Sequence, residues 1–152
     1  MEKELKVAAL RNGTVIDHIP ADKLFQVVSV LQLKVYNHPL TIGNNFDSKK
    51  TGTKGIIKIS DRFLAEHETN KIALLAPNAI INIIKEYEVI EKRTLMPGAE
   101  ILDIMHCPNP ACITNNQPVA TRFDVLKEQD VIQLRCRYCE REVKRENIKL
   151  KK

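Results

Sequence analysis

Four cysteines in the last third of the chain are the residues best suited to chemistry. Cys107 and Cys112 form one close pair, and Cys136 and Cys139 form a second pair after a long insert. Two short loops of this kind can turn four sulfurs onto one ion, so the spacing predicts a tetrahedral zinc site. Two disulfides or four unrelated thiols are the alternatives, but disulfides are rare in the reducing cytoplasm where we expect this chain.

The predicted metal has a structural role. Four thiolates fill a tetrahedral shell, whereas a catalytic zinc keeps one position open for water or substrate. His106 adjoins Cys107 and could replace a cysteine, but with four sulfurs present we interpret it as a strand residue beside the loop. One structural Zn²⁺ is therefore expected, with no catalytic residue around it.

Length and charge limit the classes of protein to consider. The 152 residues allow two small domains, and the cysteine-rich segment is too short to bury a stable core without its metal. The net charge of +5 is spread over both halves, and Glu140, Glu142 and Glu146 interrupt the basic C-terminus. A nucleic-acid-binding surface should be more strongly and more one-sidedly basic, so nucleic acid is not an expected partner.

Neither end of the chain indicates secretion or membrane insertion. The first ten residues carry charges throughout and contain no apolar core of a signal peptide. No run of about 18 apolar residues occurs, so no membrane span is expected. A soluble, cytoplasmic protein without a membrane partner is the expectation.

The hydrophobic pattern of the first 97 residues predicts strands and helices in the order β-α-β-β-α-β. Strands are expected at residues 14–19, 40–43, 56–59, 79–84 and 87–90, with a loop at 48–55. Asp22 is expected to cap a helix whose apolar face runs from Leu24 to Leu31, and residues 63–75 form the second helix. This order predicts an α+β, ferredoxin-like N-terminal domain with helices on one face of an antiparallel sheet.

A second domain is expected after Pro97 and Gly98. This pair is typical of a boundary, so we assign residues 1–97 and 98–152 to separate domains. Short strands are expected at residues 101–106, 120–126, 131–135 and 143–148, around the cysteine loops. The C-terminal part is therefore predicted to be a small all-β, zinc-ribbon-like domain.

Asp17 and His18 are the other residues that could carry chemistry. On a regular strand, neighbouring side chains point to opposite faces, so the two are not expected to form an acid–base pair with each other. The chain also lacks a serine nucleophile elbow and the glycine patterns of nucleotide-binding loops. The residues alone leave His18 either a structural strand residue or a phosphate contact.

Several motifs together resemble one known family. The segment Gly-Thr-Val-Ile-Asp-His-Ile-Pro at residues 13–20 and the cysteine pattern beginning Cys-Pro-Asn are similar to the regulatory chain of aspartate carbamoyltransferase. So are Leu-Thr-Ile-Gly at 40–43, Ile-Lys-Ile at 57–59, Ala-Pro-Asn-Ala at 76–79 and Tyr-Glu-Val at 87–89. The resemblance covers residues 5–150, with both predicted domains in order.

The resemblance implies a non-catalytic, allosteric subunit in pyrimidine biosynthesis. It implies that CTP, ATP and UTP bind the N-terminal domain and that the zinc domain docks on catalytic chains. It further implies that regulatory chains pair as homodimers through their N-terminal domains. The implied effector-binding residues are Val7, Ala9, Leu10, Asp17, His18, Lys54, Lys58, Asn82, Ile84, Tyr87, Val89 and Lys92.

These residue types suit a nucleoside triphosphate. Lys58 and Lys92 can act as point charges on ribose and phosphates, with Lys54 assisting from its loop. His18 can donate to a phosphate oxygen, and Asp17 can accept from a ribose hydroxyl. A zinc-ribbon nucleic-acid-binding protein and a small metalloenzyme are the alternative functions. The glutamates among the basic residues argue against the first, and the closed metal shell argues against the second.

Two positions depart from the family pattern. Ala8 stands where an acidic residue is expected, which bears on effector preference. Ala111 replaces an asparagine in the first cysteine loop, while Asn109 is retained.

Overall fold

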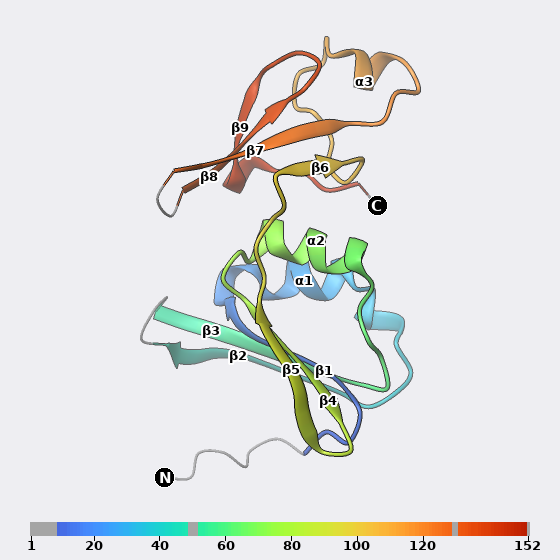
Figure 1. Cartoon of the computed structure of the whole chain (residues 1–152), viewed down its shortest axis with the longest axis vertical. Coiled ribbons are helices and arrows are strands. Elements are labelled where there is room, and N and C mark those ends of the chain that lie inside the picture. The colour runs from blue at the N-terminus through green and yellow to red at the C-terminus, as the bar shows by residue number, and fades with distance from the viewer. Residues whose placement is uncertain (1–8, 49–51, 129–130, 152) are drawn as a thin grey trace. The chain divides into compact units, whose positions relative to one another are not determined.

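A computed structural model describes residues 9–48, 52–128 and 131–151 of the chain. The chain divides into two compact units, Met1–Met96 and Pro97–Lys152. Each unit carries its own sheet (Figure 1).

The N-terminal unit has the predicted β-α-β-β-α-β order, followed by the fifth strand expected at residues 87–90. Its elements are β1 (Gly13–Pro20), the 3₁₀ turn η2 (Ala21–Lys23), α1 (Leu24–Val30), η3 (Leu33–Val35), β2 (Leu40–Ser48), β3 (Gly52–Ser60), α2 (Glu66–Leu75), β4 (Ile80–Lys85) and β5 (Glu88–Thr94). All strand pairs are antiparallel, in the order β2-β3-β1-β4-β5. The ferredoxin-like prediction is confirmed.

Helices α1 and α2 cover one face of this sheet (Figure 1). On the covered face, Ile16 of β1 lies opposite Ile57 of β3 and Ile81 of β4, and all three side chains are buried. Leu24 and Ile72 are fully buried on the two helices. Because side chains alternate along a strand, the neighbours of these isoleucines point to the opposite face of the sheet, which neither α1 nor α2 covers (Figure 1).

Three local predictions in this unit are wrong: the extent of the hairpin strands, the cap of the first helix and the start of the second helix. The hairpin strands β2 and β3 run to Ser48 and from Gly52, through residues that the sequence assigned to a loop; residues 49–51 lie outside the described part. Asp22 lies in η2 and makes no side-chain cap for α1. Helix α2 begins at Glu66 rather than residue 63, because the Glu68 carboxylate accepts the Ala65 amide at 3.0 Å and satisfies the first turn.

The C-terminal unit is a four-stranded antiparallel sheet in the order β6-β7-β8-β9. Its elements are β6 (Glu100–Leu102), α3 (Ile113–Asn116), β7 (Arg122–Glu128), β8 (Val131–Cys136), β9 (Glu142–Lys144) and the 3₁₀ turn η4 (Arg145–Asn147). Phe123 and Met105 are fully buried at its centre. The zinc-ribbon-like prediction holds, with one short helix, α3, that the all-β prediction did not include.

Within the described part of the chain, no helix combines the length and the apolar character needed to cross a lipid bilayer.

Candidate functional site

The four cysteines converge on one point in the C-terminal unit. Cys136 ends β8 and Cys112 immediately precedes α3, so two elements carry the loops that hold the sulfurs. All four Sγ atoms lie within 4.8 Å of one another, and His106 is not part of the cluster. The structure therefore brings together the four predicted ligands.

The sulfur spacing matches a metal site and not disulfides. The Sγ atoms of Cys107 and Cys139 are 3.7 Å apart, and those of Cys112 and Cys136 are 3.8 Å apart. A disulfide would require about 2.05 Å. Zinc–sulfur bonds of about 2.3 Å in a tetrahedron place the sulfurs about 3.8 Å apart. The four thiols thus have the donor type and spacing of a closed tetrahedral site.

The thiols differ in their readiness to lose a proton. Burial raises the pKa of the Cys107 thiol to about 12. Burial also acts on Cys139, but hydrogen bonds with the Asn109 side chain and the Arg141 backbone lower its pKa to about 7. A bound metal displaces these protons, because the ligand is the thiolate. With all four positions filled by sulfur, such a site stabilises the fold and has no open position for a water molecule.

In the N-terminal unit, the face of the sheet opposite the helices carries a row of polar side chains. Lys58 of β3 lies opposite Val15 of β1, Val15 lies opposite Asn82 of β4, and Asn82 lies opposite Lys92 of β5. Directly opposed residues on neighbouring strands share a face. The row therefore places two lysines and an amide from three strands on one surface, with only Val15 buried between them.

Asp17, His18 and Lys54 form a charged cluster near one end of this face. The Asp17 carboxylate lies 3.0 Å from Lys54 Nζ and accepts the His18 backbone amide at 2.7 Å. The other Asp17 oxygen lies 3.5 Å from His18 Nδ1, which is buried and has no hydrogen-bond partner in the described part of the chain. The cluster therefore places one cation and one imidazole ring around the Asp17 carboxylate.

The expectation that Asp17 and His18 point apart is wrong. It assumed a regular strand, but His18 has a φ of 60° and the register of β1 against β3 shifts between Ile16 and Ile19. This bulge turns the imidazole back toward the carboxylate of the preceding residue. The two side chains are thus neighbours. Their proximity depends on the bulge in β1, which the sequence pattern does not predict.

An apolar group lies at the other end of the open face. Ile84 pairs with Val89 and is buried, whereas the Val89 side chain is 57% exposed. Tyr87, 64% exposed, occupies the β4–β5 turn, and its backbone amide donates to the Arg11 carbonyl at 3.0 Å. This backbone contact brings the segment before β1 to the turn, so exposed apolar side chains and backbone groups lie together there.

The remaining predicted effector-binding residues precede β1. Ala9 is exposed and Leu10 is half-buried, both close in sequence to the Arg11 contact with the turn. Val7 and the departure at Ala8 lie outside the described residues.

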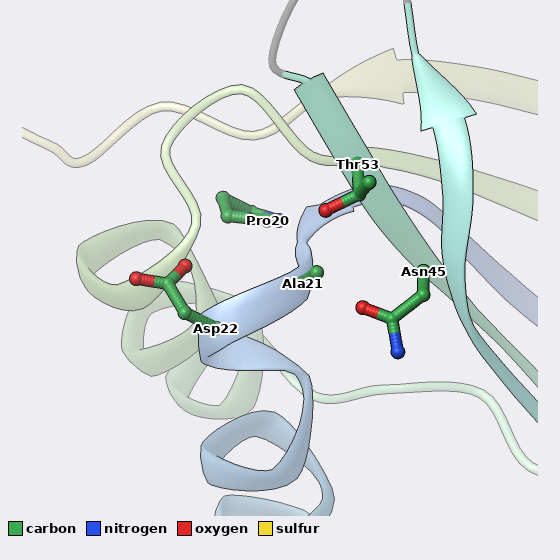
Figure 2. A pocket seen from close by; sticks show the side chains of 5 residues that line it. All are labelled: Pro20, Ala21, Asp22, Asn45 and Thr53. Atoms are coloured by element: carbon green, nitrogen blue, oxygen red, sulfur yellow. The ribbon is translucent and has the colours of Figure 1, made fainter.

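A separate hollow of about 330 Å³ adjoins the charged cluster along the chain (Figure 2). Asn45 and Thr53, from the β2–β3 hairpin, and the Pro20–Asp22 turn line it. Among the described residues that line it, Asp22 is the charged one. A carboxylate repels polyphosphate, so the described lining is a less suitable anion site than the open face.

Sequence reasoning missed several polar contacts around the cysteine loops. Asn115 and Asn116 of α3 donate to backbone carbonyls of the first loop. Arg137, in the second loop, contacts Asp124 and Glu100. The asparagines did carry a signal, because two successive side-chain amides beside a turn commonly bond nearby backbone.

Fold and site together define a two-domain protein with an α+β N-terminal domain and a small C-terminal domain whose four cysteines can hold a metal ion. Two family models match it: "Aspartate carbamoyltransferase regulatory chain, allosteric domain" over residues 5–96 and "Aspartate carbamoyltransferase regulatory chain, metal binding domain" over residues 99–149. The chain belongs to the family of aspartate carbamoyltransferase regulatory chains.

Relatives named aspartate carbamoyltransferase regulatory chain are similar over nearly their full length. The protein of Parabacteroides distasonis is 53% identical, covering 99% of this chain and 97% of the relative. That of Phocaeicola vulgatus is 52% identical, covering 98% and 96%. That of Thermococcus gammatolerans is 46% identical, covering 95% and 96%. The chain is accordingly a non-catalytic regulatory subunit with an allosteric and a metal-binding domain.

Proposed function

We propose that the N-terminal unit binds nucleoside triphosphates on the open face of its sheet and passes their effect to catalytic chains of aspartate carbamoyltransferase. The observation that carries this proposal is the gathering of cationic and polar side chains from four strands on the face that no helix covers. A triphosphate needs several cations at once, and a sheet face can supply them from separate strands.

Each side chain has a role in this proposal. Lys92, Lys58 and His18 contact phosphates or ribose, and Asn82 between the two lysines donates to the ligand. Asp17 accepts from a ribose hydroxyl and positions Lys54 through their 3.0 Å contact. The base lies toward Ile84 and Val89, where the backbone around Leu10 and Tyr87 reads its edge. CTP, ATP and UTP are the expected effectors.

Calorimetric titration tests this proposal. CTP, ATP and UTP are titrated separately into the purified chain, and then into the chain assembled with its catalytic partner. We expect binding of each triphosphate, with coupling between nucleotide and catalytic sites of about 1–3 kcal/mol in the assembly. A chain that binds none of the three would refute the nucleotide site.

We propose that the metal is one structural Zn²⁺ held by Cys107, Cys112, Cys136 and Cys139. Four thiolates at tetrahedral spacing are the preferred donor set of this ion. Metal analysis of protein purified without added metal should give one zinc per chain. A different metal, or less than one per chain after gentle purification, would contradict the assignment.

The metal domain is proposed to dock on catalytic chains through the surface around its cysteine loops. Ile113 follows Cys112 and is 41% exposed, and Tyr138 lies between Cys136 and Cys139 and is 46% exposed. Large apolar side chains exposed beside a rigid loop commonly mark a protein interface. The metal would fix the shape of both loops and hence of this surface.

The N-terminal unit is also proposed to mediate a homodimer of regulatory chains. Strand β2 is one edge of the sheet, and it exposes Ile42 and Phe46. An edge strand with apolar side chains favours association with another chain. Sedimentation of the isolated chain should give a dimer, and a monomer at micromolar concentration would argue against this contact.

His18→Gln should weaken the binding of ATP, CTP and UTP by a similar factor if His18 contacts phosphate, because the phosphates are common to the three nucleotides. In the free chain, Asp17 lies beside the imidazole and also contacts Lys54. The variant retains both of these residues, so it changes the imidazole alone.

Calorimetry of the wild type and of His18→Gln with each nucleotide measures the contribution of the imidazole, and the zinc content of the variant should stay the same. Equal affinities in the two proteins would leave His18 a structural strand residue.

A further inference from the structure

The first cysteine loop is held by two side chains of the short helix that follows it. Asn115 Nδ2 donates to the carbonyl of Cys107 at 2.9 Å and to that of Asn109 at 2.8 Å. Asn116 Nδ2 donates to the carbonyl of Pro110 at 3.0 Å and to that of Cys112 at 2.8 Å. Each asparagine thus binds the carbonyl of one ligand cysteine and that of one residue between the cysteines.

These contacts supply what the loop's own backbone lacks. Pro108 and Pro110 have no amide hydrogen, which removes two donors from the loop. The bonds within the loop run from the Cys112 amide to the Asn109 carbonyl and from the Ala111 amide to the Asn109 side chain, both at 3.0 Å. Without the side-chain amides of Asn115 and Asn116, the four carbonyls that they bind would need other hydrogen-bond donors.

We propose that Asn115 and Asn116 are positioning residues of the metal centre. By binding the carbonyls of Cys107 and Cys112, they fix the backbone from which the two sulfurs project, and so the loop is already close to ligand geometry before the ion arrives. Hydrogen-bonded groups that orient ligands in this way commonly affect metal affinity as strongly as weak ligands do. The inference rests on the proposed zinc site and concerns how tightly that site holds its ion.

Thr114 adds a contact to a sulfur itself. Its hydroxyl donates to Cys112 Sγ at 3.2 Å. Three consecutive residues of α3, Thr114 to Asn116, therefore face the first loop with donors.

The second cysteine loop is supported differently. Arg137 Nη2 lies 2.6 Å from Glu100 and 2.5 Å from Asp124, and Arg137 Nε donates to Asp124 at 3.2 Å. These side chains are partly exposed, and ion pairs in contact with water contribute little to stability. Arg137→Ala should therefore weaken metal binding less than loss of the amides at the first loop.

Metal competition on the full-length chain tests the proposal. Zn²⁺ affinity and release rate are measured against a chromogenic chelator for the wild type, Asn115→Ala, Asn116→Ala and the double variant. We expect the double variant to bind zinc about 10- to 100-fold more weakly and to release it faster. Asn147→Ala, at an exposed asparagine of η4 in the same unit, is the matched control and should behave as wild type.

Two further measurements separate positioning from general destabilisation. With saturating metal, the variants should keep the circular dichroism of the wild type, and Co²⁺-loaded protein should keep the visible bands of a four-thiolate site. If Asn115→Ala fails to fold even with excess zinc, Asn116→Ala alone decides the question.

Equal zinc affinity and equal release rates in the wild type and the folded variants would overturn the proposal. A wild-type chain that takes up no zinc would instead refute the zinc assignment itself.

Discussion

Removing the metal should unfold the C-terminal unit while the N-terminal unit stays largely folded. Structural zinc in small domains contributes about 10–16 kcal/mol of apparent binding free energy, which exceeds the stability of most complete domains. Hydrogen exchange of the full chain, before and after chelation, should show loss of protection in residues 97–152 and retained protection in the strands of residues 13–94.

The distribution of buried side chains explains this difference between the units. In the described part of the chain, most of the fully buried large apolar side chains belong to the N-terminal unit, and the C-terminal unit contributes Phe123, Met105 and Leu134. A unit of this size has too little buried apolar surface to offset the loss of chain entropy. Burial raises the pKa of the Cys107 and Cys136 thiols, so their charged, metal-binding form is disfavoured until an ion is bound.

Cys112→Ala tests what the metal does for function. The variant should lose association with catalytic chains, because the proposed docking surface surrounds the metal, while nucleotide binding changes little. Gel filtration with the catalytic partner and calorimetry with CTP measure the two effects on one preparation. Normal assembly by this variant in the absence of zinc would show that docking does not depend on the metal domain.

The sequence predicted the strands and the clustering of the four cysteines because both depend on local patterns. Runs of β-prone residues indicate β1 and β3, and cysteine spacing indicates which four side chains come together. The length of the β2–β3 hairpin could not be predicted in this way. Its outer part, residues 44–48, is polar except for Phe46, and polar residues are ambiguous between strand and loop until the partner strand is known.

The open face of the N-terminal sheet shows where sequence reasoning reaches its limit. The row of Lys58, Asn82 and Lys92 depends on strand order and register, which the residues themselves do not state. These three residues are named together as effector-binding residues only because the resemblance to a family implies that role. The contact between Asp17 and His18 escaped prediction because it depends on a bulge, and the positive φ of His18 has no residue-type signal.

Lys92→Ala should weaken the binding of ATP, CTP and UTP by a similar factor. Lys92 is exposed on β5, opposite Asn82, with its side chain on the open face. A hydrogen bond to a charged group contributes about 1.5–3 kcal/mol, and the exposure of Lys92 favours the lower end, a loss of about tenfold in affinity. The factor should be shared because the phosphates are common to the three nucleotides.

Lys85→Ala is the matched control for this test. Lys85 also lies on the β4–β5 hairpin and is exposed, but it follows Ile84 and so points to the opposite face, where its Nζ lies 5.4 Å from the centre of the Phe63 ring. Both variants remove one positive charge, so a general electrostatic effect would weaken binding equally in the two. A selective loss in Lys92→Ala assigns the effect to the open face. A loss confined to one base would contradict a phosphate role for Lys92, because only contacts to the base distinguish the three nucleotides.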